Sequence, residues 1–375
     1  MAAVSLKSFV TARLRRCREQ MRDRALDALI VVNPVDVRYL TGFTGDDSIL
    51  VITATRRVLI SDTRFTIQIQ GECPGLSRHI RKNVAMSVAL RETLNKLFSK
   101  WRKRNPPAVG IETESLPIKQ YKVFKKSVGS GFREAEGILS SLRLCKDAYE
   151  ITQTRLAAKC AQDAMKAVLR QLKIGMSEIE IAGLLDYEMA QRGGRPPAFP
   201  VIVAYGGHAA QPHAAPGKAR LKRNQTFLFD WGATVNGYKS DLTRCYGTGR
   251  IPPDFSDAYQ WVLEAQLSAI KAVKPGVRLV DADEAARKVM RKSRFPMYGH
   301  GSGHGLGLDI HEEPRLSQVS AGELAEGMIV TIEPGVYLSD RFGIRIEDDI
   351  LVTATGATCL TQFPKGPASI TNWGR

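Results

Sequence analysis

The sequence predicts two domains, an amino-terminal α/β domain over residues 1–140 and an α+β domain over residues 141–375. The chain has 375 residues, which is long for a single hydrophobic core. In its first part, short apolar runs alternate with longer amphipathic segments, as in α/β domains. In its second part, predicted helices precede a last third that is rich in strand-like runs.

The amino-terminal domain is expected to begin with an amphipathic helix over residues 10–28, where apolar residues recur at helical spacing among charged ones. A second helix is expected over residues 84–102. Residues 113–140 show no clear pattern. Strands are predicted where apolar and β-branched residues run together, over residues 29–32, 49–53, 57–61 and 108–112.

The second domain is expected to open with a long helix from residue 144 to about residue 172. Ser177 is the expected N-cap of the next helix, over residues 178–192. Further helices are predicted over residues 257–273 and 280–292, and strands over residues 199–205, 328–333 and 343–352.

A tight hairpin is predicted at Asn236-Gly237, because apolar β-prone runs flank this strong signal for a two-residue turn. With these two residues as the loop, pairing runs back until Asp230 faces Thr243. Residues two apart in a strand share a face, so Asp241 lies on the same side. Carboxylates among aromatic and aliphatic residues are costly to bury unless a cation lies between them.

A glycine-rich segment over residues 299–311 contains His300, His304 and His311. Its glycines allow the backbone and the imidazoles to approach a site closely. A dinucleotide-binding loop is the competing interpretation. It is disfavoured because alternating His residues would crowd a pyrophosphate, and because no strand leads directly into the segment.

Two glutamates follow: Glu333 ends an apolar strand, and Glu347 shares a strand face with Arg345. A charged pair inside a buried strand usually marks an ion pair or a set of ligands. The resulting set of Asp, His and Glu suits divalent ions such as Mn²⁺, Co²⁺ or Zn²⁺. Bridging carboxylates could hold two such ions about 3.5–4 Å apart.

The net charge is +16, and residues 1–140 carry 25 basic against 13 acidic residues, with basic clusters at residues 13–18 and 100–104. No nucleic-acid-binding motif accompanies this charge, so a solvated basic face is favoured over a nucleic-acid site. Residues 1–18 have the Arg-rich composition of a transit peptide, but a structural helix is the favoured interpretation.

The expected location is the cytoplasm. The six Cys residues are scattered without a Cys-x-x-Cys pair, as in proteins with reduced thiols. The amino-terminal residues lack the apolar core of a secretion signal. No apolar run approaches the roughly 20 residues needed to span a bilayer.

The segments that carry these residues resemble the pita-bread metallopeptidases, the family of methionine aminopeptidase, aminopeptidase P and prolidase (Xaa-Pro dipeptidase). Residues 1–140, with Tyr39-Leu-Thr-Gly-Phe43 and Ser61-Asp-Thr-Arg64, resemble the creatinase-like domain of aminopeptidase P and prolidase. Methionine aminopeptidases usually lack that domain and are the weaker match. The family's ligand order is Asp, Asp, His, Glu, Glu, and this chain presents Asp230, Asp241, His304, Glu333 and Glu347.

The resemblance implies a pita-bread fold for the second domain and a role for each matched residue. Asp230 would chelate one metal ion, and Asp241 and Glu347 would bridge both ions. His304 and Glu333 would complete the second ion, with Glu333 also acting as general base. The other expected roles are substrate contact for His213, proton transfer for His311, oxyanion stabilisation for His300 and orientation of Glu347 for Arg345.

The function that the resemblance implies is hydrolysis of the Xaa-Pro bond at the N-terminus of peptides or dipeptides, with two divalent ions, foremost Mn²⁺. It also implies a homodimer or a larger assembly. Dipeptidase and longer-peptide aminopeptidase remain open, because the sequence does not show what closes the pocket beyond the scissile bond. A non-catalytic binding module and a creatinase-like, metal-independent hydrolase are disfavoured, because such relatives typically lose a ligand that this chain keeps.

Overall fold

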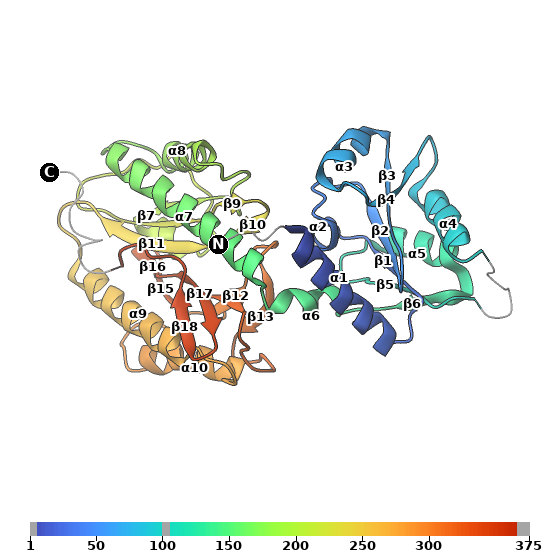
Figure 1. The fold of residues 1–375 in the computed structure, drawn as a ribbon. Helices are drawn as coiled ribbons and strands as arrows, with labels where there is room; N and C mark the ends of the chain where they lie inside the picture. Colours follow the sequence, from blue (N-terminus) through green and yellow to red (C-terminus); the bar gives the residue numbers. More distant parts are fainter. Residues whose placement is uncertain (1–5, 100–105, 366–375) are drawn as a thin grey trace. The chain divides into compact units, whose positions relative to one another are not determined.

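The computed structural model describes residues 6–99 and 106–365, and the chain divides into two compact units, residues 1–143 and 144–375 (Figure 1). The sequence predicts this division after residue 140. The basic cluster at residues 100–104 lies outside the described residues.

The amino-terminal unit is built on a mixed sheet of strand order β4-β3-β2-β1-β5-β6. The four predicted strands are present, each within one residue at either end. The strands that the sequence did not predict are β4 and β6, which are polar and partly exposed edge strands without an apolar run. The bounds are β1 Ala28–Val31, β2 Ile49–Thr53, β3 Arg57–Asp62, β4 Ser77–Arg81, β5 Val109–Ile111 and β6 Phe132–Glu134.

The helices of this unit differ more from the prediction. Helix α2 is not predicted by the sequence, because Asn33-Pro34 directly after an apolar run is also typical of the end of a strand. In the structure, the Asn33 side chain accepts a hydrogen bond from the Val35 amide at 3.0 Å and caps the helix, with Pro34 in its first turn. The bounds are α1 Leu6–Asp23, α2 Pro34–Thr41, α3 Thr66–Glu72, α4 Met86–Leu97, α5 Ile118–Val128 and α6 Ile138–Leu144.

The second unit contains two sheets of order β11-β8-β7 and β13-β12-β14-β17-β18, together with the strand pairs β9/β10 and β15/β16. The predicted strand over residues 343–352 is two strands, β16 and β17, because β16 pairs with β15 whereas β17 pairs with β14. The strand bounds are β7 Ile202–Tyr205, β8 Thr226–Trp231, β9 Thr234–Val235, β10 Tyr238–Lys239, β11 Leu242–Gly247, β12 Gly303–Gly305, β13 Glu312–Leu316, β14 Ile329–Ile332, β15 Gly335–Leu338, β16 Phe342–Arg345, β17 Asp348–Thr353 and β18 Gly356–Cys359.

Helices cover both sides of the sheet β11-β8-β7 (Figure 1). Alternate residues of β8 explain this arrangement, since Phe227 and Phe229 belong to the core under α7 and α8, whereas Leu228 belongs to the core under α9 and α10. The helix bounds are α7 Ala148–Gln171, α8 Glu178–Gln191, α9 Pro253–Ala272 and α10 Leu279–Met290.

The register predicted for the hairpin is confirmed. Both turn residues have positive φ, 50° at Asn236 and 85° at Gly237, as a two-residue hairpin turn of this type requires. Asp230 pairs with Thr243 across β8 and β11, so Asp230 and Asp241 lie on one face of the hairpin.

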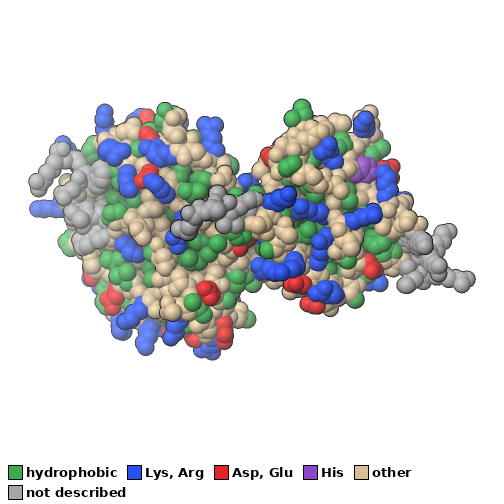
Figure 2. Space-filling model, in the orientation of Figure 1, with side chains coloured by type: hydrophobic (Ala, Val, Ile, Leu, Met, Phe, Trp, Pro, Cys, Tyr) green, Lys and Arg blue, Asp and Glu red, His purple; other side chains and the backbone are tan. Residues whose placement is uncertain are grey.

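The surface and the cysteines add two observations. Figure 2 shows Lys and Arg side chains scattered over the visible face of both units, with Asp and Glu among them. All six Cys residues are free thiols. Among the described residues, no helix combines the length and the apolar character needed to span a membrane.

Candidate metal centre

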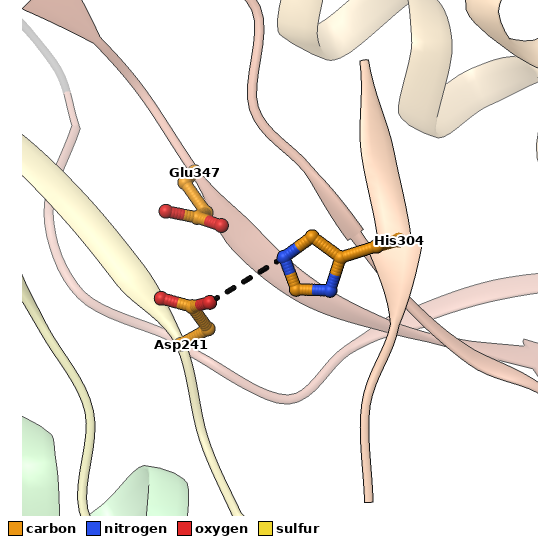
Figure 3. Close-up of side chains that lie close together, drawn as sticks. All are labelled: Asp241, His304 and Glu347. Atoms are coloured by element: carbon orange, nitrogen blue, oxygen red, sulfur yellow. Dashed lines mark ion pairs between the residues drawn. The ribbon is translucent and has the colours of Figure 1, made fainter. Parts of the chain in front are cut away.

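The five predicted ligands come from five separate segments of the second unit. Three of these ligands, Asp241, His304 and Glu347, point toward one another and place one ligand atom each within 4.8 Å of the others (Figure 3). Asp241 immediately precedes β11, His304 lies in β12 and Glu347 lies between β16 and β17. Glu333 follows β14 directly, and Asp230 lies in β8.

His304 has the protonation pattern of a metal ligand. Its Nδ1 donates to the Gly305 carbonyl at 2.9 Å, which leaves the lone pair of Nε2 free. Burial lowers the pKa of His304 to about 3, so the ring is neutral. Its Nε2 lies 3.6 Å from Asp241 Oδ2 and 3.6 Å from Glu333 Oε1. A lone pair that faces two carboxylates is repulsive unless a cation lies between them.

The electrostatics of the carboxylates also fit bound cations. Burial and the neighbouring carboxylates raise the pKa values of Asp241 and Glu347 well above their ordinary range. Burial raises the pKa of Glu333 to about 7. Together with Asp230 these are four carboxylates beside one buried guanidinium, Arg345, which leaves three negative charges (4 − 1) uncompensated when all are ionised. Two divalent ions, with four positive charges between them, would more than offset these three.

Arg345 binds Asp230 directly and Glu347 through the Thr243 hydroxyl. Its Nη2 forms a charged hydrogen bond with Asp230 Oδ2, and its Nε donates to Thr243 Oγ1 at 3.1 Å. Thr243 Oγ1 in turn donates to Glu347 Oε2 at 2.6 Å. The second oxygen of Asp230, Oδ1, is buried without a hydrogen-bond partner among the described residues and is therefore the oxygen available to an ion.

The histidines predicted to act on the substrate lie around this cluster. His213 and His311 are exposed, and the ring of His311 lies edge-to-face with the ring of His304 at 4.6 Å between centroids. His213 lies close enough to His300 and to His311 for its charge to contribute to lowering the pKa of each.

His300, for which the resemblance implies oxyanion stabilisation, is held by two hydrogen bonds. Its Nδ1 donates to the Gly301 carbonyl at 2.7 Å, and its Nε2 lies 3.0 Å from the Tyr337 hydroxyl. Burial lowers the pKa of His300 to about 4, so the ring is neutral. Nε2 then accepts from Tyr337, and in this tautomer it has no proton to donate to an oxyanion.

The structure also shows the partners of His208, for which the sequence predicts no role. Its Nδ1 lies 2.9 Å from Oε1 of the fully buried Glu178. The same carboxylate accepts from the amides of Tyr205 and Gly217, each at 2.8 Å. Glu178 therefore ties together both ends of the segment that carries His213. No sequence signal distinguishes it from an ordinary acidic residue in the first turn of a helix.

A substitution of Gly303 is expected to disrupt the centre. A Cβ atom there would lie 1.9 Å from the Thr331 carbonyl oxygen, so β12 could not remain beside β14. Gly303→Ala should lose bound metal and lower the unfolding temperature by several degrees, about 2–4 °C for each kcal/mol lost. Gly299→Ala is the matched control, because no atom lies within 4 Å of its Cβ position. Equal metal content in both variants would contradict this account.

This fold and this cluster define a metallohydrolase with a carboxylate-rich ion centre. Residues 152–354 match metallopeptidase family M24, and residues 13–145 match the creatinase/prolidase N-terminal domain. YkvY of Bacillus subtilis is 34% identical over 363 residues, which cover 94% of this chain and 98% of that protein.

Two solved structures are similar over almost the whole chain. The Xaa-Pro dipeptidase from Bacillus anthracis has a TM-score of 0.89 at 30% identity and covers 95% of this chain and 99% of its own. The X-Pro aminopeptidase from Thermotoga maritima has a TM-score of 0.85 at 31% identity and covers 93% and 99%. The chain belongs to metallopeptidase family M24. The predicted pita-bread fold, the creatinase-like first domain and the assignment as a metal-dependent hydrolase are confirmed.

Proposed function

We propose that this protein is a two-metal exopeptidase that hydrolyses the Xaa-Pro bond at the N-terminus of dipeptides or short peptides. The observation that supports it most is the convergence of Asp241, His304 and Glu347, with Glu333 beside His304. The fold around them is shared with proteins named Xaa-Pro dipeptidase and X-Pro aminopeptidase.

The ligands divide between two proposed ion positions. Asp230 Oδ1 would serve one ion, His304 Nε2 and Glu333 the other, and Asp241 and Glu347 would bridge them. Oxygen donors outnumber the single imidazole, so Mn²⁺ is the proposed ion, with Co²⁺ or Zn²⁺ as substitutes. When bound, the ions would polarise the scissile carbonyl and supply a hydroxide nucleophile at neutral pH.

The proton movements are assigned to the protein's own side chains. Glu333 is assigned as the general base, because its carboxylate lies 3.6 Å from His304 Nε2 and its side chain is still 18% exposed. His311 and His213, which are exposed beside the cluster, would contact the peptide. A tertiary Xaa-Pro amide has no N–H to offer, so such a site must hold it through the carbonyl and the free amine.

The subclass is tested with three substrates on the Mn²⁺-loaded protein: Ala-Pro, Ala-Pro-Ala and Ala-Ala. Cleavage of Ala-Pro alone identifies a dipeptidase, and release of Ala from both proline peptides identifies an aminopeptidase. Ala-Ala should react far more slowly than either. Absence of cleavage of both proline peptides, with both ions bound, would refute the proposed function.

The proposed assembly is a homodimer or larger. Sedimentation equilibrium would check this directly, because a 41.3 kDa species would identify a monomer and contradict it.

A further inference from the structure

A buried ion pair on α10 has no part in the function proposed above. Arg287 Nε binds Asp283 Oδ2 at 2.7 Å one helical turn away, and the two side chains are only 6% and 0% exposed. A buried ion pair contributes little net stability over apolar residues of similar size. The destination of its remaining hydrogen bonds therefore indicates its role.

All of these bonds go to one short segment, residues 298–302. Arg287 Nη1 donates to the Tyr298 carbonyl at 3.3 Å, and Nη2 donates to the His300 carbonyl at 2.6 Å. Asp283 Oδ1 accepts from the Ser302 amide at 3.0 Å and from the Ser302 hydroxyl at 2.6 Å. The pair thus holds the main chain on both sides of Gly301.

The Ser302 amide and the Gly301 carbonyl belong to the same planar peptide unit, in which N–H and C=O point in opposite directions. Holding the amide toward Asp283 turns the carbonyl away from α10. That carbonyl is the acceptor of His300 Nδ1 at 2.7 Å. The Leu316 carbonyl also accepts from the Ser302 amide, at 2.8 Å, and fixes the plane from the opposite strand. Asp283 therefore acts on the His300 ring through a single planar peptide unit, the one that joins Gly301 and Ser302.

His304 shows the same arrangement with a different support. Its Nδ1 also donates to the carbonyl of the following glycine, Gly305. There the next amide, of Leu306, is held by the Ile329 carbonyl of the neighbouring strand at 3.3 Å. The peptide that follows His300 precedes β12, and its amide is shared between the Leu316 carbonyl of β13 and the Asp283 carboxylate of α10, so a side chain of α10 adds to the support from the strand.

We propose that Asp283 and Arg287 are positioning residues that fix His300 in its Nδ1–H tautomer, with Nε2 as an acceptor for the Tyr337 hydroxyl. Arg345 Nη1 donates to the same Tyr337 oxygen at 3.0 Å, so the hydroxyl proton is directed at His300. The fixed tautomer orients Tyr337 beside the metal ligands. Its effect on turnover rests on the proposed function, whereas the tautomer itself does not.

The first test is a measurement of the tautomer. The full-length protein loaded with diamagnetic Zn²⁺ and labelled with ¹⁵N-His gives six imidazoles to resolve, and the signals missing from His300→Ala identify His300. In the native protein, His300 should show a protonated Nδ1 and an unprotonated Nε2. Asp283→Asn and Arg287→Gln should shift both nitrogens toward the average of two tautomers. A native Nε2–H tautomer, or unchanged shifts in both variants, would overturn the proposal.

The control is a second ion pair, at the start of the same helix. Arg278 and Asp281 pair at 2.7 Å, but their side chains are 66% and 46% exposed. Arg278→Gln and Asp281→Asn should leave the His300 signals unchanged, and a shift equal to that of the buried pair would overturn the proposal. If Asp283→Asn does not fold, Arg287→Lys replaces it, because Lys retains the charge but cannot reach both carbonyls.

The second test uses turnover of Ala-Pro. Arg287→Gln should lower kcat by about 10–100-fold through misplacement of the site, with the Zn²⁺ content unchanged. In a His300→Ala background, the same change should lower kcat by less than about twofold, since coupled residues are not additive. Equal losses in both backgrounds would show that Arg287 acts by another route. If the native protein does not cleave Ala-Pro, the proposed function fails, while the tautomer measurement still decides the inference.

Discussion

Asp241→Ala should abolish both metal retention and Xaa-Pro cleavage. The Asp241 carboxylate belongs to the cluster on two counts. Its Oδ2 lies 3.6 Å from His304 Nε2, and one of its oxygens lies within 4.8 Å of a carboxylate oxygen of Glu347. Metal ions contribute several kcal/mol of transition-state stabilisation, so kcat/KM should fall by about 10³-fold or more. Metal analysis after gel filtration and the rate of Ala-Pro hydrolysis measure the two effects.

The metal-free state provides an independent check. Burial and the neighbouring charges of Glu347 and Asp230 raise the pKa of Asp241, so its ionised form is disfavoured in the absence of cations. Metal-free Asp241→Asn should therefore unfold at a higher temperature than the metal-free native protein, whereas the metal-loaded native protein exceeds both. Activity of Asp241→Ala without bound metal would contradict the two-ion mechanism.

Asp348→Ala should destabilise the second unit by about 3–5 kcal/mol, because it leaves the buried Arg244 without its counter-ion. Arg244 Nη2 binds Asp348 Oδ1 at 2.6 Å, and neither side chain is exposed. Asp348 Oδ2 also accepts from Lys365 at 2.6 Å and from Gln266 at 2.7 Å. Urea denaturation followed by tryptophan fluorescence measures the loss.

Two further variants make this prediction specific. Arg244→Met combined with Asp348→Leu should recover part of the stability, since it leaves no fully buried charge without a partner and Lys365, which also loses Asp348, is 23% exposed. Asp281→Ala, at an exposed ion pair, is the control and should change little. A loss of less than about 1 kcal/mol in Asp348→Ala would show that the ion pair is not required.

The same pair sets a pH dependence. Burial acts to raise the pKa of Asp348, but the charges of Arg244 and Lys365 outweigh it and lower the pKa below its ordinary value. The unfolded chain then binds the proton more readily than the folded one. The contribution of Asp348 to stability is therefore complete above the ordinary Asp pKa of about 3.9 and is lost as the pH falls further.

The sequence predicted the structure most accurately where a short local feature determines the conformation of the residues around it. The Asn236-Gly237 turn specifies the pairing of every residue in its hairpin, including Asp230 with Thr243. Ser177 caps α8 through a capping box with Glu180, a signal that lies within four residues. The assignment of the five metal ligands came from family resemblance and remains a proposal, supported by the geometry around His304.

The sequence predicted poorly where distant contacts decide the structure. The split between β16 and β17 depends on two different partner strands, so the apolar run alone suggested a single strand. Only two residues of α5, Phe124 and Val128, are buried, which leaves too weak an apolar period to detect. Contacts such as Glu178 with His208 join residues about 30 positions apart and leave no local pattern.

The close approach of main chain at Gly303 also limits how this protein can diversify. A side chain at Gly343 would lie 1.7 Å from the Ala209 carbonyl oxygen, and one at Gly232 would lie 1.9 Å from the Ser240 carbonyl oxygen. A single substitution at either position would clash with backbone rather than with a movable side chain, so we expect both glycines to resist replacement. Sequence change that keeps this backbone in place is therefore expected at exposed positions, such as those of His213 and His311, rather than at these glycines.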